Sequence, residues 1–211
     1  MKLLIIGATG GTGQQVMEQA LARGHQVTAV ARKPEAITFP SPYLTVVRGD
    51  AMQYDSLLNV MWGHDAVLSA LGTRQARRPT TLYSAGIANI LGAMAETGVR
   101  RLIAVTAGAY VNDDVDPMLV RMLVKPLLNY LFGEAYADMQ RMEALMRATN
   151  MDWTIVRPAR LIDGPRTGIY RAVPERAVPN GWQITRADVA DYMLAYLDRS
   201  ESYRTAVSLA V

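Results

Sequence analysis

The residues best suited to binding a ligand are three glycines near the start of the chain. Gly7, Gly10 and Gly13 lie in the segment GATGGTG, with the spacing G-x-x-G-x-x-G, directly after the apolar run LLII. Glycine permits a sharp turn after a strand, a close approach of the backbone to a ligand, and tight packing of the next helix on the strand. Because the first N–H groups of a helix are free to bind an anion, we expect a phosphate-binding loop here. The alternative is a glycine-rich turn without a ligand. The loop residues expected to bind are Gly7, Thr9, Gly10, Gly11, Thr12 and Gly13.

Two basic residues follow the next predicted strand, QVTAVA. This strand ends about 20 residues beyond the loop, where dinucleotide-binding proteins that prefer NAD place Asp or Glu to bind the ribose hydroxyls. The sequence has Ala31, Arg32 and Lys33 there instead. An arginine can grip a 2′-phosphate and lay its plane on the adenine, so NADP is the expected cofactor, bound by Arg32 and Lys33. The alternative is that both are solvated surface charges.

Further candidate binding residues follow the other predicted strands, because ligands of open parallel sheets bind beyond the carboxyl ends of the strands. Asp50 ends the third strand, where its carboxylate can accept a hydrogen bond from an adenine amino group or can instead cap the next helix. Gly72 ends the fourth strand and lets the backbone pass close to a ribose. The set expected at these ends is Asp50, Ala51, Leu71, Gly72, Thr73, Arg74, Thr106 and Pro158.

Strands and helices alternate along the chain, which is typical of parallel strands joined by crossover helices. The fold class predicted is therefore α/β: a single doubly wound Rossmann domain over residues 1–211, with a mostly parallel sheet of about seven strands and helices on both faces. Helices are predicted over 11–23, 82–98 and 187–198, the last with a capped start at Thr185 and Asp188. The final segment, AVSLAV, is expected to be an edge strand.

Two segments outside this alternation, near 108–133 and 159–183, are expected on the substrate side. The first is rich in Leu and Met, which suit a flat ring system, although a helix packed on the core or a dimer face fits the same composition. A helix is predicted after it, from about Glu134. The second is rich in Gly and Pro and indicates a compact flap.

Composition excludes several classes of function. The 211 residues contain no cysteine, and the two histidines lie far apart, so neither a disulfide nor a metal site is expected. The net charge of +3 comes from scattered arginines without interleaved aromatic residues, which argues against nucleic acid. The apolar stretch from Met118 contains three interruptions and is shorter than the about 20 residues of a membrane span. Because a strand is predicted to begin at Met1, we expect no leader segment and a cytoplasmic location.

The motifs together resemble those of atypical short-chain dehydrogenases/reductases that bind NAD(P)H, most closely the flavin reductase/biliverdin-IXβ reductase type within the wider NmrA-like group. The resemblance implies an oxidoreductase that uses NADPH to reduce a planar acceptor such as FMN, FAD or a linear tetrapyrrole, as a monomer or homodimer. The alternative within the wider group is a non-catalytic NADP-binding redox sensor that acts through a protein partner. The segments that carry the resemblance are GATGGTG at Gly7, VAR at Val30, RGDA at Arg48, DAVLSALGTR at Asp65, GVRRLIAVT at Gly98, WTIVRPARLIDGPRTGIYR at Trp153 and RADVADYML at Arg186.

Proton transfer is where the chain departs from carbonyl-reducing short-chain dehydrogenases. Those enzymes use a Ser after the fifth strand and a Tyr-x-x-x-Lys pair, whose ammonium lowers the pKa of the tyrosine. Here the fifth strand is followed by Thr106 and Ala107, and the nearest helical tyrosine, Tyr136, is paired with Gln140. Thr106, Ala107 and Tyr136 are the candidate catalytic residues, but an uncharged Gln140 cannot favour a phenolate, so alcohol dehydrogenase or epimerase chemistry is not expected. Flavin reduction needs no such group, since its proton can come from water.

Overall fold

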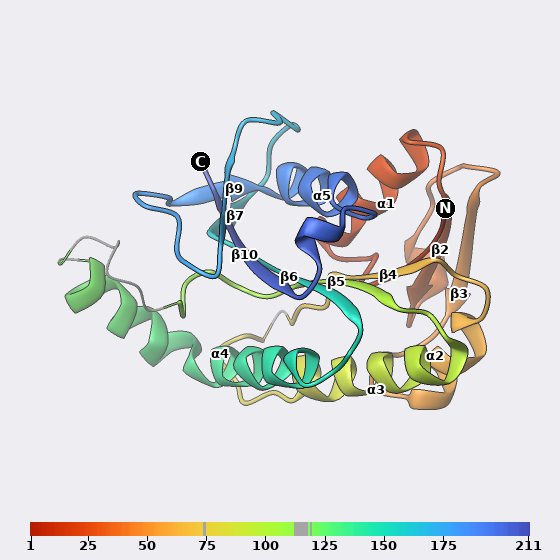
Figure 1. Ribbon diagram of the computed structural model, residues 1–211, viewed down its shortest axis with the longest axis horizontal. Helices are drawn as coiled ribbons and strands as arrows, with labels where there is room; N and C mark the ends of the chain where they lie inside the picture. The colour runs from red at the N-terminus through yellow and green to blue at the C-terminus, as the bar shows by residue number, and fades with distance from the viewer. Residues whose placement is uncertain (74, 112–117, 119) are drawn as a thin grey trace.

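The computed structural model describes residues 1–73, 75–111, 118 and 120–211. An eight-stranded sheet forms its centre, with the strand order β3-β2-β1-β4-β5-β6-β10-β8, and helices cover both faces (Figure 1). Neighbouring strands are parallel except β8, which runs antiparallel to β10. This arrangement confirms the doubly wound, mostly parallel Rossmann fold.

The bounds of the elements follow the chain. The strands are β1 (Lys2–Ile6), β2 (Gln26–Ala31), β3 (Leu44–Arg48), β4 (Ala66–Ser69), β5 (Arg101–Val105), β6 (Asp152–Pro158), β7 (Arg160–Ile162), β8 (Arg171–Pro174), β9 (Gln183–Thr185) and β10 (Thr205–Ala210). The α-helices are α1 (Gly11–Ala22), α2 (Tyr54–Met61), α3 (Leu82–Thr97), α4 (Lys125–Arg147) and α5 (Arg186–Ala195). Short 3-10 turns are η1 (Pro34–Ala36) and η3 (Ser200–Ser202), and η2 (Val120–Val124) is a π-helical turn.

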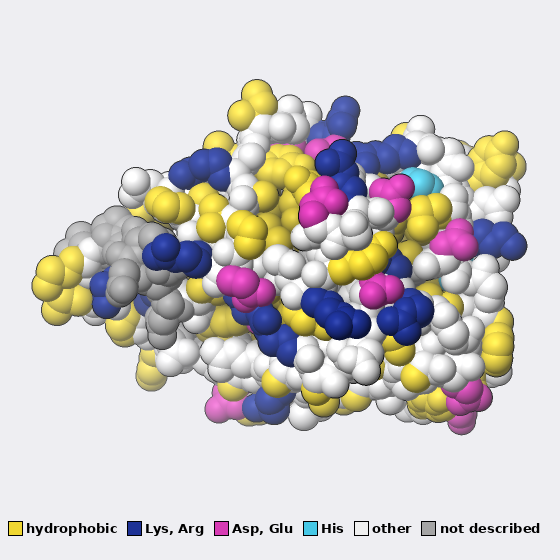
Figure 2. Space-filling view, viewed as in Figure 1, with side chains coloured by type: hydrophobic (Ala, Val, Ile, Leu, Met, Phe, Trp, Pro, Cys, Tyr) yellow, Lys and Arg dark blue, Asp and Glu magenta, His cyan; other side chains and the backbone are white. Residues whose placement is uncertain are grey.

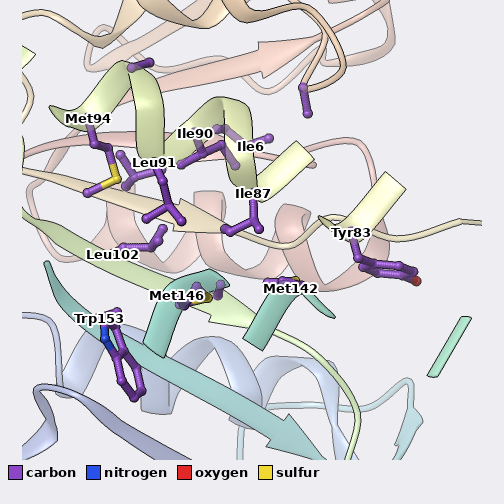
Figure 3. Packing of buried hydrophobic residues seen from close by; sticks show 14 of the residues in the cluster. Ile6, Tyr83, Ile87, Ile90, Leu91, Met94, Leu102, Met142, Met146 and Trp153 are labelled. Atoms are coloured by element: carbon purple, nitrogen blue, oxygen red, sulfur yellow. The ribbon is translucent and has the colours of Figure 1, made fainter. Parts of the chain in front are cut away.

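The sheet separates two apolar cores because alternate residues of each central strand point to opposite faces. In β1, Leu4 and Ile6 face the core under α2, α3 and α4, whereas Leu3 and Ile5 face the core under α1 and α5. The first core contains the buried side chains that α3, α4 and β5 contribute, among them Ile87, Met142 and Leu102 (Figure 3). Burial on both faces explains why these strands are continuous apolar runs in the sequence.

The far edge of the sheet differs from the prediction. The C-terminal segment, expected at an edge, forms β10 and lies between β6 and β8, so β8 is the edge strand. The sheet therefore has eight strands where about seven were expected, and β7 and β9 pair separately in a small parallel sheet. Pairing of β8 with β10 joins segments about thirty residues apart, which local patterns do not reveal.

Helix α4 is longer than predicted and changes the interpretation of the apolar segment before it. The helix begins at Lys125 rather than near Glu134, directly after η2, with Pro126 in its first turn. The first half of α4 extends beyond the sheet at one end of the molecule (Figure 1). None of the described residues between 108 and 133 lines the large cavity described below, so the role of this segment on the substrate side stays a prediction.

The flap formed by residues 163–182 is fixed to α5 by two carboxylates. Thr185 caps α5 as predicted, since its hydroxyl accepts a hydrogen bond from Asp188 N–H at 3.0 Å. The Asp188 carboxylate accepts hydrogen bonds from the N–H groups of Thr167 and Gly168, at 2.7 and 2.9 Å. Although burial alone would raise the pKa of Asp188, these hydrogen bonds lower it.

Asp191, one turn further along α5, makes the second attachment. Its carboxylate binds Tyr170 and Arg166 of the flap, both at 2.9 Å, and Arg23 at the end of α1 at 2.6 Å. Arg166 and Tyr170 thus attach the first part of the flap to the layer formed by α1 and α5. In the part of the chain that the structure describes, no helix is long and apolar enough to cross a bilayer.

Arg101 joins the elements at the amino end of the sheet. It is buried at the start of β5 and has no carboxylate partner within hydrogen-bond distance among the described residues; instead its guanidinium donates to the carbonyl oxygens of Leu197, Asp152 and Tyr196 at 2.7–2.8 Å. It also binds the hydroxyls of Thr154 and Ser202. Burial lowers the pKa of Arg101 to about 10, so the group remains charged near neutral pH.

Arg101→Met is expected to destabilise the protein by about 3 kcal/mol or more, because it leaves several buried acceptors without a donor. Arg199→Met, which removes an exposed arginine at the same end of the sheet, is the matched control and is expected to cost less than about 1 kcal/mol. Urea unfolding of both variants measures the difference. Equal free energies of unfolding in the two variants would show that the Arg101 network contributes little.

Candidate functional site

The described residues form one large cavity, of about 920 Å³, at the carboxyl ends of β1, β2, β3, β4 and β5. The strand order places Arg32 and Asp50 at one end of the cavity and Thr106 and Ala107 at the other. Across four interstrand spacings of about 4.8 Å, this gives about 19 Å, enough for two joined nucleotides. The cavity lies where the order of strands reverses, on either side of β1, as expected for a doubly wound sheet.

The glycine-rich loop has the backbone geometry that its spacing predicts. Gly7 has a φ of +84°, and a Cβ there would lie 2.4 Å from the carbonyl oxygen of Ala70 at the end of β4. A Cβ on Gly13 would lie 2.1 Å from the carbonyl oxygen of Gly7, so only glycine lets α1 pack this closely on the turn. Gly7 thus makes the turn after β1, and Gly13 sets the position of α1.

The N-terminus of α1 opens into the cavity. Gly10 is its N-cap and makes no side-chain capping hydrogen bond, and Gly10, Gly11 and Thr12 all line the cavity. The first turn of α1 contains no acidic side chain. Free N–H groups and the positive end of the helix dipole therefore point at the space where an anion would bind.

The end of the cavity beyond β2 and β3 contains one exposed cation, Arg32, and one carboxylate, Asp50. Arg32 lines the cavity and forms no ion pair with any residue that the structure describes. Asp50 Oδ1 accepts a hydrogen bond from Met52 N–H at 3.0 Å, which closes a local turn. Asp50 does not cap α2, whose N-cap is Gln53, so its second carboxylate oxygen is available for a ligand amino group.

Most of the residues predicted to bind the cofactor line this cavity together, although their contact with a cofactor stays a prediction. Gly13, Lys33 and Pro158 do not line it: Gly13 packs against Gly7, Lys33 is exposed on the turn before η1, and Pro158 is buried. Arg74 lies outside the described residues. The predicted residues that line the cavity are Gly7, Thr9, Gly10, Gly11, Thr12, Arg32, Asp50, Ala51, Leu71, Gly72, Thr73, Thr106 and Ala107.

Tyr136 lies apart from the other catalytic candidates. It lines a second, smaller cavity of about 420 Å³ with Gln140 and Arg77, not the large one. Its ring packs against Tyr110 and Phe132, with centroid distances of 5.6 and 6.1 Å. Burial raises the pKa of Tyr136, which makes it a poorer acid or base at neutral pH. A chemical role for Tyr136 therefore has little geometric support.

A buried ion pair lies behind Thr106. Glu143 of α4 binds Arg157 of β6 through two nitrogens, the Nε at 2.9 Å, and both side chains are largely buried. The same carboxylate accepts hydrogen bonds from the hydroxyls of Thr106 at 3.1 Å and Tyr110 at 2.5 Å. Burial, and then the charge of Glu143, raise the pKa of Tyr110. The Thr106 proton is therefore held by Glu143, which leaves its oxygen as a hydrogen-bond acceptor.

Several lining residues were not predicted from the sequence. Arg186 at the start of α5 lies beside the glycine-rich loop, although its segment was interpreted only as a helix start. A cation in the first turn of a helix opposes the helix dipole, and this is the signal that could have marked it. Other residues added by the structure include Met52, Gln75, Leu82, Tyr83, Met139 and Leu161.

Comparisons with known proteins bear on the same residues. Residues 7–200 match a family described as NAD(P)H-binding. An uncharacterized chloroplast protein of Arabidopsis thaliana is 30% identical in an alignment that covers 95% of this chain and 73% of that protein. The structure of a candidate NADH-flavin reductase of Streptococcus pneumoniae is 28% identical, with a TM-score of 0.79 over 100% of this chain and 99% of that one. The anaerobillin reductase ChuY of Escherichia coli O157:H7 has the same fold, at 23% identity and a TM-score of 0.80 over 100% and 97% of the two chains.

Gly10→Val is expected to abolish dinucleotide binding in a protein that still folds. The Gly10 backbone is extended, and a Cβ there meets only the Gly7 carbonyl oxygen, at 3.4 Å, so the added branch occupies space beside the cavity. Gly13→Ala is expected instead to lower the free energy of unfolding by about 2 kcal/mol or more, because its Cβ has no room. Calorimetric titration and thermal unfolding separate the two effects. A folded Gly10→Val protein with unchanged affinity would mean that the loop does not bind the cofactor.

Proposed function

The chain belongs to the NAD(P)H-binding family, and on that premise we propose that it is an NADPH-dependent reductase that transfers hydride to a planar acceptor, such as FMN, FAD or a linear tetrapyrrole. One observation carries the proposal: the large cavity combines an anion-binding helix N-terminus and Arg32 at one side with a mostly uncharged end near Thr106. The helix N-terminus and Arg32 suit a phosphorylated dinucleotide. The uncharged end near Thr106 suits a flat ring next to the nicotinamide.

The cavity residues divide into binding and positioning roles. The loop from Gly7 to Thr12 would hold the diphosphate, Asp50 the adenine, and Arg32 the 2′-phosphate. When bound, NADPH supplies the hydride; the acceptor takes it together with a proton from water, so reduced acceptor and NADP⁺ are the products. The protein needs to orient the two rings and exclude competing reactions rather than supply an acid.

The acceptor end of the cavity supports a ring substrate. Ala107, Met139 and Leu161 line it, and methionine adapts its shape to flat surfaces. The S. pneumoniae neighbour is named for flavin reduction and ChuY for the reduction of anaerobillin, and these names support the two acceptor classes that we propose. We therefore propose a small-molecule acceptor as the partner, and neither nucleic acid nor a membrane. On the face shown in Figure 2, basic side chains are interspersed with acidic ones, which supports the absence of a nucleic-acid partner.

The hydrogen bonds around Thr106 argue against reduction of simple ketones. A carbonyl-reducing site needs a hydroxyl that donates to the substrate oxygen and a tyrosine with a lowered pKa. The Thr106 hydroxyl donates to Glu143, and the pKa values of Tyr110 and Tyr136 are both raised. Hydride transfer to a flavin or bilin does not require either group.

A redox sensor without turnover is the second candidate, and one observation favours it. The turn η2 and the first half of α4 expose apolar side chains, including those of Met122, Leu127 and Tyr130, which a protein partner could cover. The two candidates are separated by mixing the protein with NADPH and FMN, FAD, riboflavin, biliverdin or quinones and following the loss of nicotinamide absorbance. Binding of NADPH without oxidation by any acceptor would favour the sensor.

Preference for NADPH over NADH is expected, because Arg32 borders the cavity where an NAD-specific protein has a carboxylate. A charge-assisted contact contributes on the order of 1.5 to 3 kcal/mol, or about tenfold to a hundredfold in affinity. Calorimetric titration of Arg32→Ala should show this loss for NADPH and little change for NADH. Lys33→Ala, which changes an adjacent cation outside the cavity lining, is the control. Equal affinity of the wild type for both cofactors contradicts the assignment.

Tyr136→Phe is expected to lower the turnover rate with flavin less than about tenfold, since the hydroxyl lies outside the lining of the large cavity. Met139→Ala, on the same helix but lining that cavity, should raise KM for the acceptor more than it lowers kcat. Steady-state rates of the two variants decide the point. A hundredfold loss in Tyr136→Phe would identify the tyrosine as a proton donor.

A further inference from the structure

We propose that Arg186 contacts the diphosphate of the bound dinucleotide, as part of the phosphate-binding site beside Gly11 of the glycine-rich loop. The inference rests on the binding of NAD(P)H and adds a residue to that site. It assigns the two arginines of the cavity to different phosphates: Arg32 to the 2′-phosphate, and Arg186 to the diphosphate that NADH and NADPH share.

The position of Arg186 is fixed by the packing of α5 beside α1. Its Cδ and Nε lie 2.8 and 2.9 Å from the point that a Cβ on Gly11 would occupy. Gly11 has no positive φ, so the close contact here is with the Arg186 side chain, which would have to shift to make room for a Cβ. Arg186, Gly10, Gly11 and Thr12 line the same cavity. A cation thus lies directly against the helix N-terminus at which the anion is expected.

The stability of α5 does not explain a cation at this position. Arg186 is the first residue of α5, after the N-cap Thr185, where the positive end of the helix dipole disfavours a basic side chain. Asp188 in the same turn is the residue that suits the dipole. A basic residue here is best explained by the ligand that it faces.

The ion pair of Arg186 leaves the guanidinium available to a ligand. Its Nη1 donates to Asp163 Oδ1 at 2.7 Å, but the Asp163 side chain is 93% exposed, and such solvated pairs are weak. A guanidinium has five N–H donors in a planar fork, so it can bind a phosphate in two places while retaining this partner. The neighbouring Arg23 and Arg166 differ, because both bind the largely buried Asp191 and neither lines the cavity.

This division of roles gives two different binding patterns. Loss of Arg186 removes a contact to the part that is common to both cofactors, so NADPH and NADH should weaken by the same factor. Loss of Arg32 removes a contact that only NADPH has. Adenosine 2′-monophosphate, which carries the 2′-phosphate and no diphosphate, should respond to Arg32 alone.

Calorimetric titration of Arg186→Gln with NADPH, NADH and adenosine 2′-monophosphate tests the proposal, and thermal unfolding checks that the variant is folded. The affinity for both dinucleotides should fall about tenfold or more, and the affinity for the monophosphate should not change. The ratio of the NADPH affinity to the NADH affinity should stay within about twofold of wild type. Arg186→Lys, which keeps the charge but not the fork, should lose less. A loss below about twofold, a changed ratio, or an equal loss for the monophosphate overturns the proposal.

Two controls separate ligand contact from structural support. Asp163→Asn removes the ion pair and keeps Arg186, so it should bind both cofactors at least as well as wild type; if it reproduces the loss, the contact is structural and the proposal is wrong. Arg166→Gln removes a nearby cation outside the cavity and should change nothing. If the wild type itself binds neither dinucleotide, the cofactor assignment is wrong. If the wild type binds them and Arg186→Gln binds them equally well, only the role of Arg186 is wrong.

Discussion

The approach of the α1 backbone to the turn after β1 fixes the rest of the site. With Gly13 against the carbonyl oxygen of Gly7, no side-chain atom separates helix from turn, so the position of the first turn of α1 is set by backbone contact alone. Everything that converges on the anion site is placed relative to that turn: the ends of β1 and β4, and Arg186 through the packing of α5 on α1. A single added methyl group there displaces the helix end on which binding depends.

Much of this arrangement could be predicted from sequence, because local physics determines it. Apolar runs predicted the central strands, which are buried on both faces, and the glycine spacing predicted the loop. The family resemblance is confirmed over residues 7–200. What could not be predicted depends on contacts between distant segments. The pairing of β10 with β8 is one such case, and the approach of Arg186 to Gly11 is another. The start of α4 was missed because the segment before Glu134 was interpreted from its Leu and Met content as lying on the substrate side, whereas the helix begins at Lys125.

The buried Glu143–Arg157 pair fixes the hydrogen bonds of the hydroxyl groups around Thr106. Two charges removed from water persist only when their hydrogen-bonding capacity is filled, and Thr106 and Tyr110 complete it. The hydroxyls of Thr106 and Tyr110 are thereby held as hydrogen-bond donors to the Glu143 carboxylate. A site built in this way is well ordered and poor in mobile protons, which suits transfer of hydride to an acceptor that takes its proton from solvent.

The Arg101 network has a consequence for where the molecule can change. It ties β5, β6, the end of α5 and η3 together at the amino ends of the strands, whereas the cavity occupies their carboxyl ends, one strand length away. Amide protons around Arg101 should exchange with solvent only on global unfolding, whereas those of the loops around the cavity exchange by local opening. Substitutions in the loops around the cavity can then change the ligand that the protein binds. They leave intact the Arg101 network, which stabilises the opposite end of the sheet.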